Sequence, residues 1–290
     1  MRDSSVSSWI VERWNRVHDA KIGAISNPVI FTDLDGTLLD SDTYSWAGAA
    51  VALDELKRRR IPVVLNSSKT LAELTPLRAE LGLEHPVIAE NGAVIDVPDN
   101  YFSGELAVRQ TPAERAVLQR VYRVVRRGGD YRCEAFFEMG EAGIVAATGL
   151  DPAAAHLANE RRATEPVLWR DIPQRYEAFC AAIEAHGLRC LRGGRFTHVM
   201  GQVDKASAMM SLMAAFRKES PDETLTCIAL GDGPNDAAML AAADIAVVVR
   251  ARHGHSIDLG DHPHVIRTEQ EGPPGWQNAL FDLLETRTRG

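Results

Sequence analysis

The feature that most constrains this chain is an apolar run at residues 29–32 that ends abruptly in Asp33, Asp35 and Gly36. A strand inside a parallel sheet is buried on both faces, so it reads as a continuous apolar run with polar residues at its end. Open α/β sheets bind their ligands at the carboxyl ends of such strands. The run therefore predicts an α/β fold with two carboxylates at the ligand-binding edge. By itself, an ordinary acidic turn after a strand is an equally good interpretation.

The two acids also predict a cation. Carboxylates this close together raise one another's pKa unless a positive charge neutralises them. Mg²⁺ is the expected ion, because proteins usually hold it through one or two carboxylates together with phosphate and water. Gly36 permits the tight turn that lets both acids face one point.

Three later segments place further polar groups at strand ends or helix starts. The apolar run at 225–230 ends in GDGPND (231–236), and the run at 61–65 ends in NSSKT (66–70). Asp204 and Lys205 stand just before an apolar helical pattern at 208–216. The four segments thus supply an acid pair, hydroxyls, a lysine and a second acid cluster to the carboxyl edge of one predicted sheet.

Together these segments resemble the haloacid dehalogenase (HAD) superfamily of aspartate-nucleophile phosphohydrolases, over residues 29–249. The resemblance implies a HAD-type Rossmann-like parallel sheet core with an inserted α+β cap domain, and Mg²⁺ as the cofactor. Asp33 would be the nucleophile, and Asp35 the general acid and base. Ser67 would donate a hydrogen bond to the phosphoryl group, and Lys205 would offset its charge. The implied metal ligands are Asp33, Asp35, Asp232 and Asp236.

Further substrate contacts are predicted beside these residues. Ser67 is preferred to Ser68 as the phosphoryl donor, because it falls where superfamily members with a Thr-Gly-Arg ending carry their threonine. Lys69 then matches the arginine of that ending. The substrate contacts predicted from the core segments are Ser68, Lys69 and Asn235.

The alternation of predicted helices and strands indicates a core that is interrupted by an inserted domain. Helices at 47–60 and 71–81 alternate with strands at 61–65 and 87–89, as in a parallel sheet. From about Asp99 this regular alternation stops, and helices are predicted at 112–127 and 152–162. The alternation typical of the core starts again near Arg195. We therefore expect an N-terminal extension at 1–27, a core at 28–98 and 195–290, and a cap at 99–194. The extension is predicted to carry an amphipathic helix at 7–25, with Ile10, Trp14 and Val17 on one face.

The cap borders carry a narrower resemblance. The sequence ENGA (90–93) follows the third core strand, as in sugar phosphatases of this branch. The segments 67–70, 162–166 and 193–198 look like those of mannosyl-3-phosphoglycerate phosphatases, although Thr164 stands where serine is often found. Such a substrate carries a carboxylate that suits arginine and hydroxyls that suit other polar groups. The implied contacts are Asn91, Gly92, Arg162, Glu165, Arg195 and His198; for Arg162 and Glu165 an exposed helix end with a capping role is as good an interpretation.

Composition excludes several other classes. The net charge of −8 argues against a general nucleic-acid surface. No stretch is apolar for long enough to cross a bilayer, and the amino-terminal residues lack the pattern of a signal peptide. The four cysteines show neither CxxC nor metal spacing, which suits a reducing cytosol. We expect a cytoplasmic monomer or homodimer that acts on a small phosphorylated sugar derivative and binds neither nucleic acid nor membrane.

Three alternatives stay open at this stage. A broader hexose- or sucrose-phosphate phosphatase would share every motif above. A phosphomannomutase-like phosphotransferase shares the acid pair but must retain a bisphosphorylated intermediate. A non-catalytic receiver also groups aspartates and a lysine around Mg²⁺, but it is far shorter and needs neither an inserted cap nor an acid at Asp35.

Overall fold

The computed structural model describes residues 25–104, 113–252 and 256–286 of the 290. The predicted extension at 1–27, with the helix that was to carry Ile10, Trp14 and Val17, lies almost wholly outside these residues. No helix in the described ranges is both long and apolar enough to span a membrane.

The core is a seven-stranded sheet with the strand order β11-β10-β9-β1-β2-β3-β4, parallel except for the β3–β4 pair. The chain adds β2 and β3 on one side of β1 and β9 to β11 on the other, so the strand order reverses at β1. That reversal is the position where open α/β sheets bind ligands. The strands are β1 (Pro28–Thr32), β2 (Val63–Asn66), β3 (Val87–Ala89), β4 (Val94–Asp96), β9 (Thr226–Gly231), β10 (Ile245–Arg250) and β11 (Val265–Glu271).

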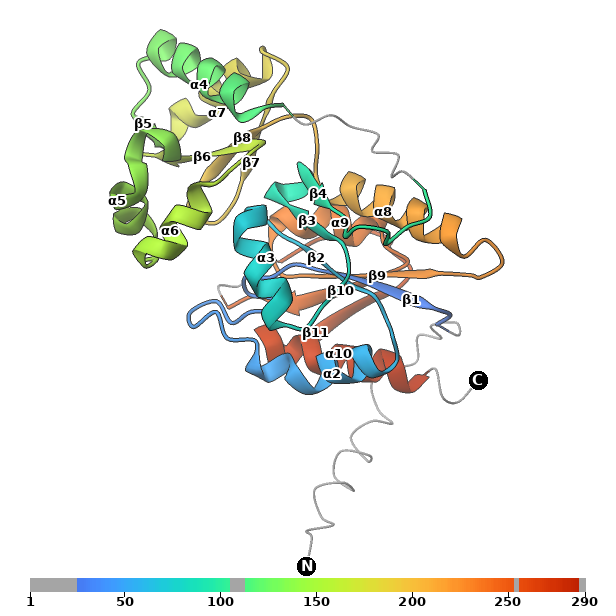
Figure 1. Cartoon of the computed structure of the whole chain (residues 1–290). Coiled ribbons are helices and arrows are strands. Elements are labelled where there is room, and N and C mark those ends of the chain that lie inside the picture. The colour runs from blue at the N-terminus through green and yellow to red at the C-terminus, as the bar shows by residue number, and fades with distance from the viewer. Residues whose placement is uncertain (1–24, 105–112, 253–255, 287–290) are drawn as a thin grey trace, which may run out of the picture.

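Helices cover both faces of this sheet (Figure 1). Successive residues of a strand point to opposite faces, so Ile30 packs with α2 and α10 while Phe31 packs with α8 and α9. Leu74 of α3 joins the first of these two clusters. The helices are η1 (Ala47–Ala49), α2 (Ala50–Arg58), α3 (Leu71–Glu80), η2 (Glu90–Gly92), α8 (Lys205–Glu219), η3 (Pro234–Asp236), α9 (Ala237–Ala242) and α10 (Gly272–Thr286).

A second, antiparallel sheet with the order β5-β6-β8-β7 forms the cap, above the carboxyl edge of the core sheet (Figure 1). Helices α4 and α7 pack on one face of this sheet, around Tyr122, Phe179 and Val199. The cap elements are α4 (Arg115–Gly129), β5 (Cys133–Ala135), α5 (Phe136–Thr148), α6 (Pro152–Asn159), β6 (Thr164–Trp169), α7 (Pro173–Glu184), β7 (Arg189–Arg192) and β8 (Thr197–Met200). The predicted α/β fold, with a parallel core sheet and a cap, is confirmed.

Two boundaries differ from the sequence interpretation. We expected the chain to return to the core at residue 195, but β8 pairs with β6 and β7, so the cap sheet extends to Met200. A short buried strand reads the same in either sheet, because its pairing partners are not visible in its own sequence. The helix expected at 152–162 ends at Asn159, and residues 160–163 lead into β6 instead.

Candidate active site

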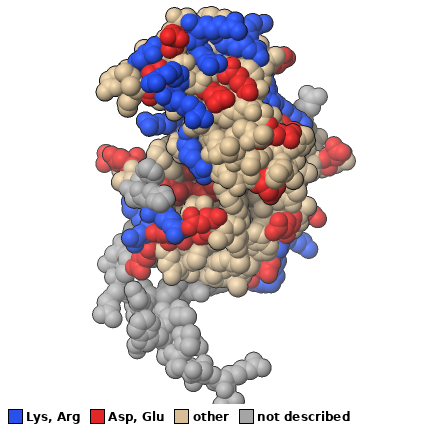
Figure 2. Space-filling model, turned by 90° about the vertical axis from the view of Figure 1, so that its left-hand side faces the viewer, with Lys and Arg blue, Asp and Glu red and all other residues tan. Residues whose placement is uncertain are grey.

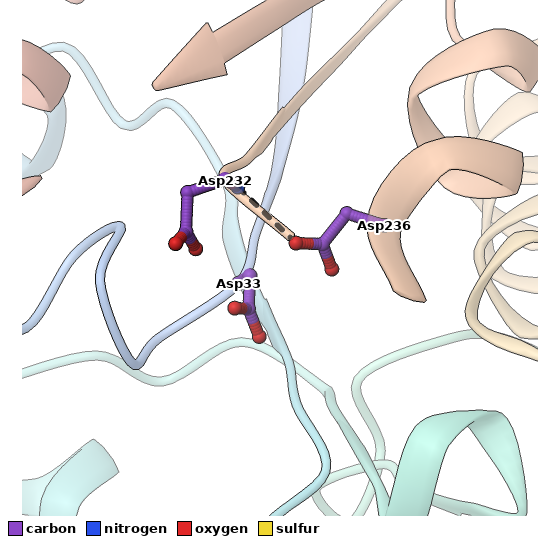
Figure 3. Close-up of side chains that lie close together, drawn as sticks. All are labelled: Asp33, Asp232 and Asp236. Atoms are coloured by element: carbon purple, nitrogen blue, oxygen red, sulfur yellow. Dashed lines mark hydrogen bonds between the residues drawn. The ribbon is translucent and has the colours of Figure 1, made fainter. Parts of the chain in front are cut away.

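Three carboxylates meet where the strand order reverses. Asp33 directly follows β1, Asp232 directly follows β9, and Asp236 ends η3. Because β1 and β9 are neighbours in register, the backbone N–H of Asp33 donates to the carbonyl of Leu230 at 2.9 Å. One oxygen from each of the three acids lies within 4.8 Å of the others. Figure 3 shows the group at the ends of these two strands.

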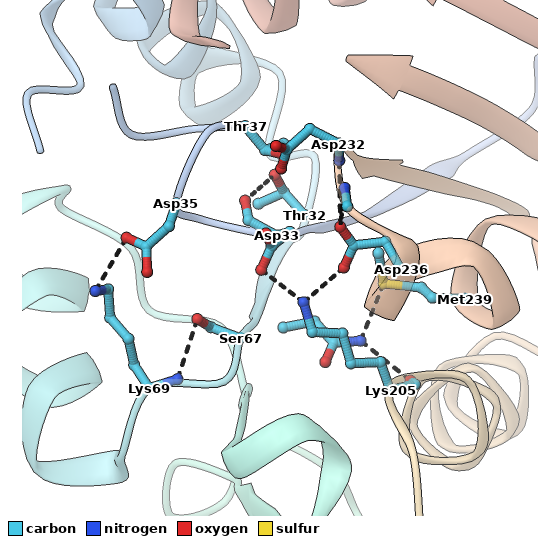
Figure 4. Close-up of polar contacts among 12 residues, drawn as sticks. Thr32, Asp33, Asp35, Thr37, Ser67, Lys69, Lys205, Asp232, Asp236 and Met239 are labelled. Atoms are coloured by element: carbon cyan, nitrogen blue, oxygen red, sulfur yellow. Dashed lines mark hydrogen bonds and ion pairs between the residues drawn. The ribbon is translucent and has the colours of Figure 1, made fainter. Parts of the chain in front are cut away.

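A buried lysine holds two of these acids. Lys205 is 1% exposed, and its Nζ lies 2.6 Å from both Asp33 Oδ1 and Asp236 Oδ1 (Figure 4). It is the first residue of α8, whose N-cap is Asp204, and the Asp204 side chain accepts from the backbone N–H of Ser207. Burial alone would lower the pKa of Lys205, but the charges of Asp236 and Asp33 outweigh it and raise the pKa above its ordinary value.

The turn after Asp33 packs directly against Asp232. Gly36 has a φ of +83°, and a Cβ at that position would lie 2.5 Å from Asp232 Oδ2. The hydroxyl of Thr37 donates to Asp232 Oδ1 at 2.8 Å. Glycine is thus required here both for its left-handed backbone and for the close approach of the acid.

Asp236 organises the loop after β9. Its Oδ1 accepts from Lys205, and its Oδ2 accepts from the backbone N–H groups of Asp232 and Gly233 at 3.2 and 3.0 Å. The Asp236 carboxylate thus binds three donor atoms from two segments, the start of α8 and the loop after β9, so it fixes the position of Lys205 as well as contributing charge. Asn235 turns back onto the same loop, because a Cβ at Gly233 would lie 2.5 Å from its Oδ1.

The three acids fit a hard divalent cation. Burial, then the charges of Asp33 and Asp236, raise the pKa of Asp232 to about 7. Burial and the charge of Asp33 also raise the pKa of Asp236 above its ordinary value. Such shifts mean that the negative charge of the group is only partly compensated by Lys205. An ion such as Mg²⁺, bound through carboxylate oxygens, would supply the missing positive charge.

The side chain of Asp35 does not belong to this group of three acids, and its role as a metal ligand stays a prediction. Its Oδ1 pairs with Lys69 Nζ at 3.0 Å, and this pair lies apart from the three acids in Figure 4. Lys69 Nζ also lies 5.0 Å from the ring centre of Tyr44. Burial raises the pKa of Asp35, Lys69 opposes that rise, and the charge of Asp33 adds to it. Lys69, predicted as a substrate contact, therefore neutralises Asp35 in this structure.

The loop after β2 places Ser67 opposite the acids (Figure 4). Ser67 is 1% exposed, and its Oγ accepts from the backbone N–H of Lys69 at 3.2 Å. Within the described part of the chain no acceptor takes its hydroxyl hydrogen, which leaves Ser67 able to donate to an anion. Ser68 contributes its carbonyl oxygen, which accepts from Arg161 of the cap at 3.2 Å.

The segment η2 rests on this loop. The backbone N–H of Asn91 donates to the carbonyl of Ser67 at 2.9 Å. Both polar atoms of the Asn91 side chain are buried without a partner among the described residues. Gly92 has a φ of +96°, and a Cβ there would clash with the main-chain oxygen of Asp204. Gly92, predicted to touch substrate, is thus needed for the contact between η2 and the start of α8.

Alternate residues of β6 and β8 point to opposite faces of the cap sheet, so the predicted contacts in these strands fall on two different faces. Thr164 pairs with Met200, Glu165 with Val199 and Pro166 with His198. Val199 lies in the cap cluster beneath α4, so Glu165 faces away from the core, whereas Met200 packs with Ala93 and Val203. His198 therefore shares the core-facing side of the sheet.

Two of the four predicted cap contacts bind other parts of the cap, and a third is exposed. Glu165 is fully buried and accepts from Arg115 Nε at 2.8 Å, from Gln119 Nε2 and from the backbone N–H of Phe137. Arg195 is exposed and donates to the carbonyls of Ala147 and Thr148, at the end of α5. Arg162 is exposed too. Among the described residues no hydrogen bond or ion pair joins these three side chains to the acids, so their contact with a substrate stays a prediction.

Two residues that matter were passed over. Arg161 reaches from the cap to Ser68, although the prediction chose its neighbour Arg162. Glu90 is fully buried and accepts from the backbone N–H groups of Arg162 and Ala163 at 2.7 and 3.1 Å. Arg161 lies before β6, so the alternation of the strand gave no signal for it. The partners of Glu90 are two main-chain groups and the hydroxyl of Thr164, which lies 74 residues further along the chain, so a local pattern could not reveal them.

The charge of the acid group predicts a pH dependence. Asp232 has a raised pKa in the folded state, so without a divalent cation the folded protein binds a proton that the unfolded chain releases. The free energy of unfolding should therefore fall as pH rises from about 4 to above 7. Asp232→Asn should remove part of this loss and be the more stable protein at pH 8.

Addition of Mg²⁺ should reverse that order. An ion at about 100 times its Kd stabilises the folded state by about 2.7 kcal/mol, and Asp232→Asn should gain much less. Denaturant melts at pH 5 and pH 8, with Mg²⁺ or with a chelator, measure both effects. Asp54→Asn, on the exposed side of α2, is the control. An equal gain in Asp232→Asn and in the parent protein would show that the ion binds elsewhere.

Comparison with known proteins agrees with this geometry. Residues 30–145 match the family of haloacid dehalogenase-like hydrolases. A Thermoplasma acidophilum protein is 16% identical with a TM-score of 0.63, over 90% of this chain and 99% of that one. A HAD-superfamily phosphatase from Bacteroides thetaiotaomicron is 19% identical with a TM-score of 0.63, over 91% and 97%. A sugar phosphatase of HAD subclass IIB is 16% identical with a TM-score of 0.60, over 88% and 99%.

At these identities the structural likeness establishes the fold, and the family match covers the segment that carries Asp33, Ser67 and the first part of the cap. The arrangement of the strands and of the cap is thus shared with these structures over about nine tenths of the chain. The chain has the fold of the haloacid dehalogenase superfamily, and its residues 30–145 match the haloacid dehalogenase-like hydrolase family.

Proposed function

We propose that the protein is a Mg²⁺-dependent phosphomonoester hydrolase that acts through an aspartyl-phosphate on Asp33. The observation that carries this proposal is the environment of the Asp33 carboxylate, which lies between the ammonium group of Lys205 and two further acids. A carboxylate in this position can attack phosphorus once the negative charge of the phosphoryl oxygens is neutralised. Bound Mg²⁺ would neutralise phosphoryl oxygens and hold them beside Asp33.

The residues of the chain divide the first step between them. Lys205 occupies Asp33 Oδ1, so the other carboxylate oxygen is the one to attack phosphorus. The hydroxyl of Ser67 donates to a phosphoryl oxygen from the opposite side. Lys205 stays protonated through the reaction, because two carboxylates raise its pKa. These groups are preorganised in the folded state, and preorganised charge is usually the largest contribution to catalysis.

Asp35 would complete the reaction by two proton transfers, one in each step. It donates the proton to the oxygen of the leaving alcohol, and then removes a proton from the water that attacks the phosphorylated Asp33. Its raised pKa favours the protonated form that the first step needs. Lys69 provides a resting partner for the carboxylate while it is ionised.

The substrate we propose is a glycosyl-3-phosphoglycerate, mannosyl- or glucosyl-, with the glycosylglycerate as product. The support is the likeness of segments 67–70, 162–166 and 193–198 to mannosyl-3-phosphoglycerate phosphatases and the position of the cap over the acids. Residues 99–200 contain arginine and no lysine, and basic side chains gather on the cap in Figure 2. Such a surface suits an anionic substrate. A cytoplasmic location and a monomeric or homodimeric state stay predictions.

A panel of phosphate esters tests the substrate. Phosphate release should be fastest from a glycosyl-3-phosphoglycerate and slower from hexose phosphates, sucrose phosphate and 3-phosphoglycerate. A preference for hexose or sucrose phosphates would favour the broader sugar phosphatase. Interconversion of hexose phosphate isomers without net phosphate release would favour a phosphomannomutase-like transferase.

Asp33→Asn should abolish turnover without loss of the fold. The amide cannot form the acyl-phosphate, but its oxygen still accepts a hydrogen bond from Lys205. Phosphate release measures turnover and a thermal melt measures the fold, with Asp54→Asn as the charge-matched control. Appreciable activity in folded Asp33→Asn would exclude this residue as the nucleophile.

Asp35→Asn should slow the reaction by about 10²- to 10⁴-fold, the usual contribution of positioned proton transfer. An aryl phosphate with an acidic leaving group needs no proton in the first step. With that substrate the variant should form phosphorylated Asp33 at a near-normal rate and then accumulate it, because hydrolysis still lacks a base. Rapid-quench kinetics measures both steps. Equal slowing with both kinds of substrate and no trapped intermediate would contradict this role.

A further inference from the structure

Two buried polar atoms near the junction of cap and core have no partner among the described residues: Nε of Arg161, which lies just before β6, and Nδ1 of His198 in β8. Buried donors and acceptors in folded proteins are nearly always paired, and leaving one unpaired costs about 1–3 kcal/mol. Both atoms belong to residues near the acid group, since the charge of Lys205 acts on His198 and Arg161 bonds to Ser68. They mark a place where a ligand would complete the bonding.

Arg161 is fixed across the joint between cap and core. Its Nη1 donates to the carbonyl of Ser68 at 3.2 Å and to the hydroxyl of Thr164 at 2.8 Å. The guanidinium carbon lies 5.8 Å from the ring centre of Phe136. These contacts occupy one nitrogen and one face of the guanidinium plane, and Nε is left to bind an acceptor.

A buried carboxylate of the core fixes the segment that carries Arg161. Glu90 accepts from the backbone N–H of Arg162 at 2.7 Å, from that of Ala163 at 3.1 Å and from the hydroxyl of Thr164 at 2.6 Å. Thr164 thus links Glu90 to Arg161 through one hydroxyl. A guanidinium held this way loses little further conformational freedom when it binds an anion, which favours affinity.

His198 lies beside this cation as a neutral ring. It is 7% exposed, and burial, then the charges of Arg161 and Lys205, lower its pKa to about 3. At neutral pH it therefore offers one N–H and one lone pair, which suits a hydroxyl group rather than an anion. Arg161 is the charged member of the two.

We propose that Arg161 binds a carboxylate on the leaving alcohol of the substrate, and that His198 binds a neighbouring hydroxyl. The substrate class is then a phosphate monoester of a hydroxy acid. This inference rests on the proposed function, and it assigns the specificity of that function to Arg161. Of the other arginines of the matching segments, Arg162 is exposed, and Arg195 donates to the end of α5. Planar guanidinium and carboxylate groups pair through parallel hydrogen bonds, so the match is geometric as well as electrostatic.

Binding to a catalytically silent protein tests this separately from turnover. In the Asp33→Asn background, calorimetric titration with Mg²⁺ present would compare 3-phosphoglycerate with glycerol 3-phosphate, which has a CH₂OH group in place of the carboxylate. We expect 3-phosphoglycerate to bind about 10- to 100-fold more tightly, as for a hydrogen bond to a charged group. Arg161→Met should remove this preference, and the matched neighbour Arg162→Met should keep it.

A second variant covers the case in which Arg161→Met does not fold. Arg161→Gln keeps a donor for Ser68 and removes the charge, so it should also lose the preference. Weaker binding of both ligands to the same extent would place Arg161 on the phosphoryl group and overturn the proposal, as would a preference unchanged in the Arg161 variants. Absence of phosphate release from every ester by the parent protein would overturn the proposed function instead, whatever the binding result.

Discussion

The active site depends on one buried cation, the ammonium group of Lys205. It joins the start of α8 to the ends of β1 and β9, through Asp33 and Asp236, so three segments far apart in sequence share one charge network. Removal of one partner of a buried pair typically costs about 3–5 kcal/mol, because the remaining charge stays buried. The network is therefore constrained by folding as well as by chemistry. Asp232 makes no ion pair with the lysine, and burial and the charges of Asp33 and Asp236 raise its pKa, so a bound cation would stabilise its ionised form.

The position of the cap depends on a second buried charge. Glu90 and Asn91 both have left-handed backbones, with φ of 52° and 57°, a conformation that costs about 1–3 kcal/mol for residues other than glycine. Three hydrogen bonds from residues 162–164 to Glu90, and the bond from Asn91 to Ser67, offset this cost. The strained turn thus ties the cap to the same loop that holds Ser67. Movement of the cap would disturb the loop on which the phosphoryl group is expected to rest.

The sequence predicted the core well because its signals are local. A buried parallel strand is an apolar run, its carboxyl end is a site of polar residues, and the reversal of strand order at β1 brings Asp33, Asp232 and Asp236 together. The cap was harder, because a short antiparallel strand does not reveal its neighbours. One residue of register separates Thr164, which faces the core, from Glu165, which faces α4, and the sequence alone does not show which of the two sides each residue takes. The pairing of Asp35 with Lys69 was also missed, since side-chain partners across a loop leave no periodic signal.

The two cations nearest to the proposed substrate differ in kind, and the difference matches their tasks. Lys205 is a compact charge that fits between two carboxylates. Because an ammonium group has no preferred plane, it could also stabilise a phosphoryl group of tetrahedral or trigonal-bipyramidal shape. Arg161 is a planar fork that stacks on Phe136 and presents Nε in a fixed direction, which suits a planar carboxylate. In the proposed reaction the core, where lysines lie at the acids, would hold the phosphoryl group, and the cap, whose basic side chains other than histidine are all arginine, would bind the leaving group. The free energy of binding the leaving group can be used to position the phosphate ester over Asp33. Recognition of the leaving group would therefore also affect the rate of attack.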